Sequence, residues 1–263
     1  MTTPKTNYKE KLIYGFLGLC TTITVGFLFW LIGYILYRGL GHINFTALIP
    51  PILTTIYMVG IGLGLSVPIG IGAAIYINEY SLNGKFIKLV RWGTECLAAV
   101  PSILFGLFGM MFFVTTLKMS WCILAGGLTV ALMVLPTVVK TTEEALKTVP
   151  VSYREASLAL GATKISTIVK VVLPSAIPGI LTGVILSTGR IIGETAAIFL
   201  TAGTVFGIPD NVMSSGRTLA VHLYMLAKEG LSFEEAYGAA VLLLGIILCL
   251  NFISYTIAKK MTK

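Results

Sequence analysis

Two oppositely charged side chains, Arg190 and Glu194, stand in the middle of a long apolar stretch of this sequence. Their spacing of four residues is that of neighbours on one face of an α-helix. The planar guanidinium group of arginine donates paired N–H groups to an oxyanion, and a nearby carboxylate can balance its charge when no anion is bound. The pattern therefore predicts either an anion path lined by Arg190 or a buried ion pair that joins helices, and the residues alone leave both open.

The apolar stretch around this pair is too long for a simple membrane crossing. Residues 177–208 would extend about 48 Å as a straight helix, whereas the hydrocarbon core of a bilayer is about 30 Å thick. We therefore expect the segment to tilt, break or turn back, with breaks at Gly193 and Gly203. A charge near the bilayer centre costs roughly 2.5–3.5 kcal/mol, so Arg190 is expected to face the bundle interior or a water-filled path.

The composition of the 263 residues is that of a membrane protein. Hydrophobic residues make up 56% of the chain and charged residues only 11%, against about 25% charged residues in soluble domains. An ordinary soluble enzyme, a disordered tail and a nucleic-acid-binding module are thereby excluded. No catalytic triad or metal-binding motif occurs, so we expect no enzyme chemistry and no cofactor in this chain. Six apolar stretches are long enough to cross a bilayer as helices, at residues 12–37, 52–77, 96–117, 122–139, 177–208 and 237–257. Pro101 predicts a kink in the third of these spans.

The distribution of basic residues predicts the orientation of these six helices. Fourteen of the nineteen Lys and Arg residues fall in segments on the side of the N-terminus, and four fall in the opposite loops. The positive-inside rule then places both termini in the cytosol. This asymmetry accounts for the net charge of +8 without a nucleic-acid partner. We divide the chain into residues 1–50, an anchor helix with the first outside loop, and residues 51–260, the core of the all-α polytopic fold.

The cytosolic loop at residues 141–172 has strong local signals. Ser152 and Glu155 have the spacing of a capping box at a helix start, and Gly161 suits a left-handed turn at a helix end. A second helix is expected to begin near Thr163. The prediction is a short helix, a tight turn and another helix, which on these grounds alone is equally well an ordinary amphipathic connector.

Smaller polar signals have structural interpretations. Arg91 and Glu95 are four residues apart and predict an ion pair at the start of the third span. Glu79 follows the second span, where we expect it to be solvated. His42 and His222 are single and distant in the sequence, so we interpret them as surface residues of outside loops rather than metal ligands.

The cytosolic loop resembles the EAA loop of bacterial ABC importer permeases, whose pattern is E-A-A-x3-G-x9-I-x-L-P. Here the pattern is Glu155-Ala156-Ser157-x3-Gly161-x9-Val171-x-Leu173-Pro174, with two modest replacements, Ser157 and Val171. The resemblance implies the type I fold of ABC importer permeases. It also implies that Glu155 and Ala156 dock on an ATPase subunit, and that Gly161 forms the turn.

Two further segments resemble phosphate ABC permeases of the PstA type. Residues 189–197 match G-R-x-x-G-E-T-A, and residues 100–109 are similar to a second element of that family. The resemblance implies an ATP-driven phosphate importer in a bacterial inner membrane, in which Arg190 and Glu194 line the substrate path. Its implied partners are a PstC-type permease, two PstB-type ATPases that bind ATP and Mg²⁺, a PstS-type phosphate-binding protein, and membrane lipid.

Residues 209–235, in the last outside loop, match no pattern. Two alternatives remain open for the function. One is an ABC permease for another oxyanion, such as molybdate, sulfate or a phosphonate. The other is a passive anion channel or a membrane-embedded structural subunit, neither of which needs an EAA loop.

Overall fold

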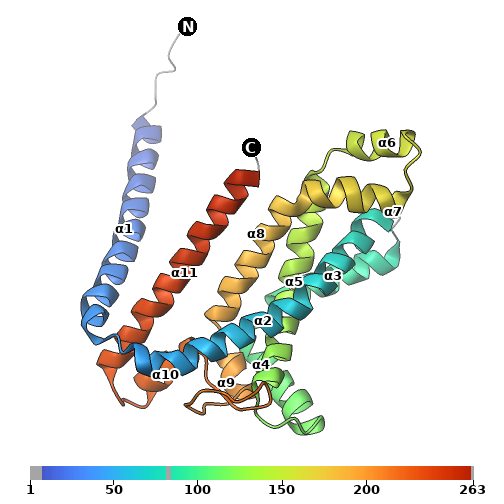
Figure 1. Cartoon of the computed structure of the whole chain (residues 1–263). Coiled ribbons are helices and arrows are strands. Elements are labelled where there is room, and N and C mark those ends of the chain that lie inside the picture. Colours follow the sequence, from blue (N-terminus) through green and yellow to red (C-terminus); the bar gives the residue numbers. More distant parts are fainter. Residues whose placement is uncertain (1–7, 81–83, 262–263) are drawn as a thin grey trace.

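The computed structural model describes residues 8–80 and 84–261, and within these ranges it contains helices and turns but no strands (Figure 1). The elements are α1 (Tyr8–Gly39), η1 (Leu40–His42), α2 (Phe45–Ile75), η2 (Tyr76–Tyr80), α3 (Lys85–Ala99), α4 (Ser102–Gly109), η3 (Met110–Thr116), α5 (Ile123–Thr148), α6 (Val151–Ala159), α7 (Lys164–Thr167), η4 (Ile168–Val172), α8 (Leu173–Ile192), α9 (Ala196–Thr201), α10 (Leu219–Lys228) and α11 (Phe233–Met261).

The helices supply the expected membrane crossings. Five helical segments among the described residues are long and apolar enough to span a bilayer: Leu12–His42, Phe45–Tyr80, Ile123–Thr148, Lys164–Ile192 and Phe233–Ile253. A sixth span forms if the bent pair Ile87–Ala99 and Ser102–Thr116, which meet at 99°, is counted as one. With that pair included, the prediction of six spans is confirmed. The bend lies at Val100 and Pro101, whose backbones are extended, so the predicted kink at Pro101 is also confirmed.

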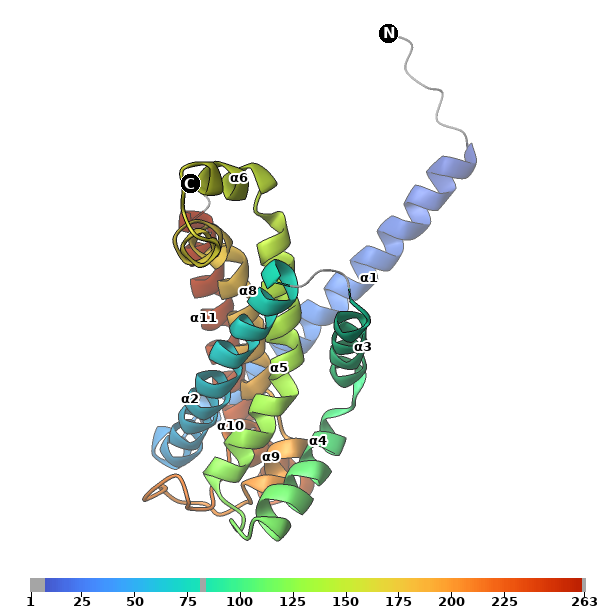
Figure 2. The same ribbon diagram turned by 90° about the vertical axis from the view of Figure 1, so that its right-hand side faces the viewer.

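The described ends of the chain lie at the same end of the bundle, although α1 splays away from the other helices (Figures 1 and 2). Figures 1 and 2 show the start of α1, the end of α11 and helix α6 at this end, whereas α9 and α10 lie at the opposite end. We call these the α6 end and the α10 end. The cytosolic placement of both termini stays a prediction, and residues 1–7 and 262–263 lie outside the described residues. The division of the chain after residue 50 also stays a prediction.

Helix α5 lies at the centre of the bundle and is the most buried of the five unbroken spans. Small residues let its neighbours approach closely. Gly70 of α2 lies against Val138, and Gly179 and Gly183 of α8 lie against Ala145 and Thr141. A Cβ atom at any of these glycines would overlap the facing side chain, which is the close packing that small residues permit between membrane helices. Helices α2, α5 and α8 therefore form the closely packed centre of the fold.

The predicted fifth span is divided in the structure. Helix α8 ends at Ile192, residues 193–195 are not helical, and the short helix α9 follows. The expected break at Gly193 is therefore confirmed, and Gly203, which follows α9, has a left-handed backbone with φ +87°. The boundaries 177–208 were wrong because the helical segment that crosses the membrane starts earlier, at Lys164, and stops before α9.

Candidate functional site

Helix α6 and the turn after it form the loop that the sequence assigns to ATPase docking. Pro150 occupies the N-cap position, and no side chain caps the helix start. The predicted capping box is therefore wrong, because the helix begins two residues earlier than Ser152 as N-cap would require, at Val151, and Ser152 lies inside it. Glu155 and Ala156 are both exposed on α6, where their side chains are accessible to a partner.

Gly161 closes the turn between α6 and α7. Its φ is +82°, a left-handed conformation that glycine adopts without strain. The N–H of Gly161 donates to the Leu158 carbonyl at 3.0 Å, and the N–H of Ala162 donates to the Ser157 carbonyl at 3.2 Å. This bond pattern is the Schellman motif of helix C-termini. The predicted turn is confirmed, as is the new helix near Thr163, whose hydroxyl accepts the N–H of Ser166 at 3.3 Å.

The outer surface of this loop carries several large apolar side chains that are exposed. Leu160 is 89% exposed, and Val151, Tyr153, Leu158 and Ile165 are also exposed. Large apolar side chains gathered on the tip of a protein mark an interaction surface. The tip of the loop, at the α6 end of the bundle (Figure 1), therefore carries apolar side chains that a partner protein could contact.

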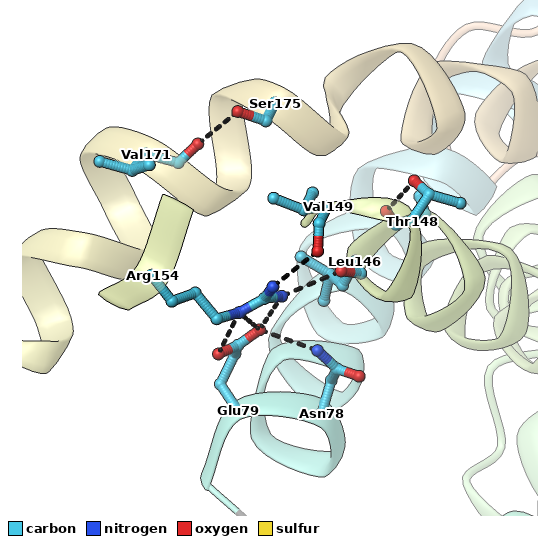
Figure 3. A network of polar contacts seen from close by, with 9 residues as sticks. Asn78, Glu79, Leu146, Thr148, Val149, Arg154, Val171 and Ser175 are labelled. Carbon is cyan, nitrogen blue, oxygen red and sulfur yellow. Dashed lines mark hydrogen bonds and ion pairs between the residues drawn. The ribbon is translucent and has the colours of Figure 1, made fainter. Parts of the chain in front are cut away.

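Arg154 anchors α6 to the transmembrane helices (Figure 3). Its guanidinium donates from Nη2 to Glu79 Oε1 at 2.8 Å and from Nε to Glu79 Oε1 and Oε2 at 3.2 and 3.3 Å. It also donates to the Val149 carbonyl at 2.8 Å and the Leu146 carbonyl at 3.0 Å. Asn78 donates to Glu79 Oε1 at 2.8 Å. Glu79 is not solvated as predicted, because its side chain is only 8% exposed beneath α6.

A second charged cluster lies at the α6 end, between α3 and α5. Arg91 Nη2 lies 2.8 Å from Glu143 Oε1, and Lys147 Nζ lies 2.6 Å from the same oxygen. The predicted pairing of Arg91 with Glu95 is wrong. Glu143 takes the place of Glu95 because α5 packs beside α3 and presents a nearly buried carboxylate there.

Arg190 lies in the last turn of α8 and is half-buried. Its Nη1 donates to Thr137 Oγ1 of α5 at 3.4 Å, the one hydrogen bond of this side chain among the described residues. Because a guanidinium has five N–H groups, most of its donors are left for water or a ligand. No local pattern in the sequence indicates Thr137 as a partner, since this hydroxyl comes from a helix 53 positions away along the chain.

Glu194 does not pair with Arg190 as its spacing suggests, but accepts a backbone hydrogen bond. Its side chain is buried, and Oε1 accepts the N–H of Ala197 at the start of α9, at 3.1 Å. No ion pair joins it to Arg190 in the described part of the chain. The prediction that both side chains share one helix face is wrong, because α8 ends at Ile192 before Glu194 is reached.

This geometry predicts different effects for two substitutions of Glu194. Glu194→Gln keeps an oxygen that accepts the Ala197 N–H, so its thermal unfolding is expected to remain close to that of the wild type. Glu194→Ala removes the acceptor and is expected to cost about 1 kcal/mol, as other helix caps do. Differential scanning fluorimetry of the purified protein measures both. Equal losses in the two variants would show that the negative charge, rather than the hydrogen bond, is what matters.

His222 of α10 is buried, contrary to its predicted place on the surface. Its ring stacks on Phe206, with the centroids 5.3 Å apart, and the Arg217 guanidinium lies 4.4 Å from the Phe206 ring centre. Burial, reinforced by the positive charge of Arg217, lowers the pKa of His222 to about 4. His42 is exposed, as predicted, and lies 3.2 Å from Glu234. No group of metal-binding side chains occurs among the described residues.

The lowered pKa of His222 predicts a loss of stability in acid. Unfolded histidine has a pKa near 6.5, so protons bind the unfolded chain more readily, and stability is expected to fall as the pH drops from about 6.5 to about 4. The slope from this group is at most about 1.4 kcal/mol per pH unit. His222→Phe keeps a ring against Phe206 but does not titrate, so its melting temperature should depend less on pH over this range. An unchanged pH profile in His222→Phe would assign the acid sensitivity to other groups.

Comparison with known proteins places the chain in a family. The family model for the binding-protein-dependent transport system inner membrane component matches residues 66–263. The chain belongs to this family. It is thus a multi-pass membrane protein and a permease component of a transport system.

Several relatives are similar to this permease along most of its length. The probable ABC transporter permease protein YqgI of Bacillus subtilis is 32% identical, covering 96% of this chain and 97% of its own. The phosphate transport system permease protein PstA of Haemophilus influenzae is 30% identical, covering 92% and 91%. PstA of Mycobacterium leprae is 38% identical, covering 71% and 62%.

Solved structures show the same fold. The permease superposes on a chain of a bacterial alginate ABC transporter with a TM-score of 0.74 at 16% identity, covering 97% of this chain and 96% of the other. It superposes on a chain of the MetNI methionine ABC transporter with a TM-score of 0.68 at 19% identity, covering 82% and 97%. The predicted fold of an ABC importer permease is therefore confirmed.

Proposed function

We propose that this permease forms half of the translocation path of an ATP-driven importer of inorganic phosphate. The observation that carries the proposal is Arg190, a half-buried cation near the end of a membrane-spanning helix with only the Thr137 hydroxyl as a hydrogen-bond partner among the described residues. An unpaired guanidinium inside a membrane is costly, and a doubly charged oxyanion is the ligand that its paired N–H groups fit. Similarity to PstA permeases along 92% of the chain supports the choice of phosphate.

In the proposed assembly, different partners bind at the two ends of the bundle. A homologous PstC-type permease completes the path, and two PstB-type ATPases, which bind ATP and Mg²⁺, sit below the membrane. One of them covers the exposed apolar tip of α6 around Glu155 and Ala156, which lies on the cytosolic side by the positive-inside rule. A PstS-type protein delivers phosphate at the α10 end. Membrane lipid surrounds the complex, and no nucleic acid takes part.

Glu194 has an indirect part in this proposal. By capping α9 it fixes the course of the chain directly after Arg190, so it sets the position of the path wall. It does not neutralise Arg190 in this conformation. An exchange of partners between Arg190 and Glu194 during transport remains part of the proposal for other states of the cycle.

The test is uptake of radiolabelled phosphate by the complete complex in proteoliposomes with ATP inside. We expect uptake that requires ATP and the binding protein, and that excess molybdate, sulfate or a phosphonate does not suppress. If one of these anions suppresses phosphate uptake and is itself taken up, the permease would be assigned to that oxyanion. Flux of phosphate without ATP would favour a passive anion channel.

A further inference from the structure

Helix α6 has non-helical connections on both sides. Before it, Val149 and Pro150 are extended, with ψ values of 123° and 141°. After it come the left-handed Gly161 and the extended Thr163. Neither connection continues the backbone hydrogen bonds of α6 into α5 or α7. The position of α6 relative to the spans therefore depends on its side-chain contacts.

The strongest of these contacts joins α6 to the second span. Three hydrogen bonds link the Arg154 guanidinium to the Glu79 carboxylate, and the two side chains are only 18% and 8% exposed. A bidentate pair of this kind fixes both distance and angle. The contact between α6 and α7 is weaker, a single hydroxyl bond of 2.9 Å between Ser157 and Thr167.

Glu79 stands at one end of a continuous helical segment, Phe45–Tyr80, that reaches the other end of the bundle. There Thr55 Oγ1 accepts the N–H of Leu219 at 3.0 Å, and Gly216 lies so close to Thr54 that a Cβ on it would be crowded. Both contacts fix the chain that enters α10. The α2 segment thus touches α6 at one end and the start of α10 at the other.

The same segment passes beside the charged residue of the path. Gly62 of α2 lies against Ile191, the residue that follows Arg190, and a Cβ atom at Gly62 would come within 2.9 Å of the Ile191 side chain. Ile191 is completely buried. Because tightly packed side chains transmit displacement rather than absorb it, a shift of α2 changes the position of Arg190.

We propose that the Arg154–Glu79 ion pair makes α2 move with α6, so that α2 carries the displacement of α6 to Arg190 and to the α10 end. This inference rests on the proposed function, in which an ATPase moves α6. Arg154 is then a positioning residue, which acts on the path through Glu79 and touches neither ATP nor phosphate. The ion pair and the packed side chains of α2 form a contiguous network of the kind that can carry coupling between distant sites.

The experiment compares phosphate uptake per ATP hydrolysed in the complete complex in proteoliposomes. Arg154→Gln and Glu79→Gln are each expected to lower this ratio at least tenfold, and the double variant no further, because both substitutions break one link. The matched control is Arg91→Gln. It breaks another Arg–Glu pair of 2.8 Å at the same end, which joins α3 to α5 and leaves Glu143 its contact with Lys147. Its ratio is expected within twofold of the wild type.

A second pair of substitutions separates coupling from folding. Replacing both Arg154 and Glu79 by Met removes the buried charges together, a change that proteins often tolerate. This variant should assemble with its ATPases and still show a ratio at least tenfold below the wild type. A double-Met variant that assembles and transports normally would overturn the inference.

The movement of α2 on addition of ATP can be measured directly. It would not change if the Arg154–Glu79 pair had only a structural role. Spin labels at the exposed positions Ile56 of α2 and Leu248 of α11, with the four natural cysteines replaced, report their separation with and without ATP. We expect a change of separation in the wild type that Arg154→Gln abolishes. The same change in Arg154→Gln would refute the inference. Failure of the wild-type complex to take up phosphate would instead count against the proposed function.

Discussion

Arg190→Gln is expected to lower phosphate uptake at least about 100-fold while the permease still assembles with its partners. A hydrogen bond to a charged group contributes about 1.5–3 kcal/mol, and the paired donors of the guanidinium offer two to one oxyanion. Their loss corresponds to about 100-fold in occupancy. Assembly should survive, because the substitution removes a charge that is costly inside the membrane and breaks only one long bond, to Thr137.

Uptake of radiolabelled phosphate and copurification of the partner subunits measure these two effects separately. Arg190→Lys keeps the charge but not the paired donors, so it should fall between the wild type and Arg190→Gln. Arg38→Gln serves as the matched control, since Arg38 is an exposed arginine at the end of α1 that lies over the ring of Tyr34. Normal uptake by an assembled Arg190→Gln complex would remove Arg190 from the path.

Gly161→Val is expected to lower ATP-driven uptake at least tenfold. The φ of Gly161 is +82° and a Cβ atom there would meet nothing within 4 Å, so the cost comes from the backbone alone. It amounts to about 1–2 kcal/mol for an ordinary L-residue and is most severe for a β-branched one. The turn would relax to another conformation, and α6 would no longer present Glu155 and Ala156 to the ATPase in the same orientation.

Gly161→Asn is the matched control, because asparagine tolerates the left-handed region. Its uptake should stay within a few-fold of the wild type. Equal losses in the Val and Asn variants would indicate that the turn conformation is not the cause. A passive channel would conduct equally in all three proteins, so this series also separates an importer from a channel.

Features that depend on local backbone rules could be predicted from the sequence. The turn at Gly161 follows from the left-handed φ that glycine permits, and the bend at Pro101 follows from the extended backbone that proline favours in the residue before it. The break at Gly193 agrees with the low helix propensity of glycine, since its own φ of -82° is an ordinary helical value. The number and nature of the spans follow from the lengths of the apolar stretches. These parts of the fold and of the loop that contains α6 needed no knowledge of how the helices pack.

Features that depend on packing could not be predicted in this way. The spacing of Arg190 and Glu194 suggested a shared helix face, but a helix that ends at Ile192 gives the two side chains different neighbours. Arg154 and Glu79 are 75 positions apart, and only the folding of α6 over the end of α2 brings them together. The sequence contains both residues, but no motif or spacing in it indicates that their side chains form an ion pair.

The exposure of Leu160 has a consequence for the biogenesis of this protein. A permease synthesised without its ATPase exposes an apolar surface at the end of α6 to water. Chaperones and quality-control proteases recognise surfaces of this kind. The subunit is therefore expected to be short-lived as an orphan and to persist once its stoichiometric partner is present. Cells that make both proteins together would gain a means of discarding unassembled pores.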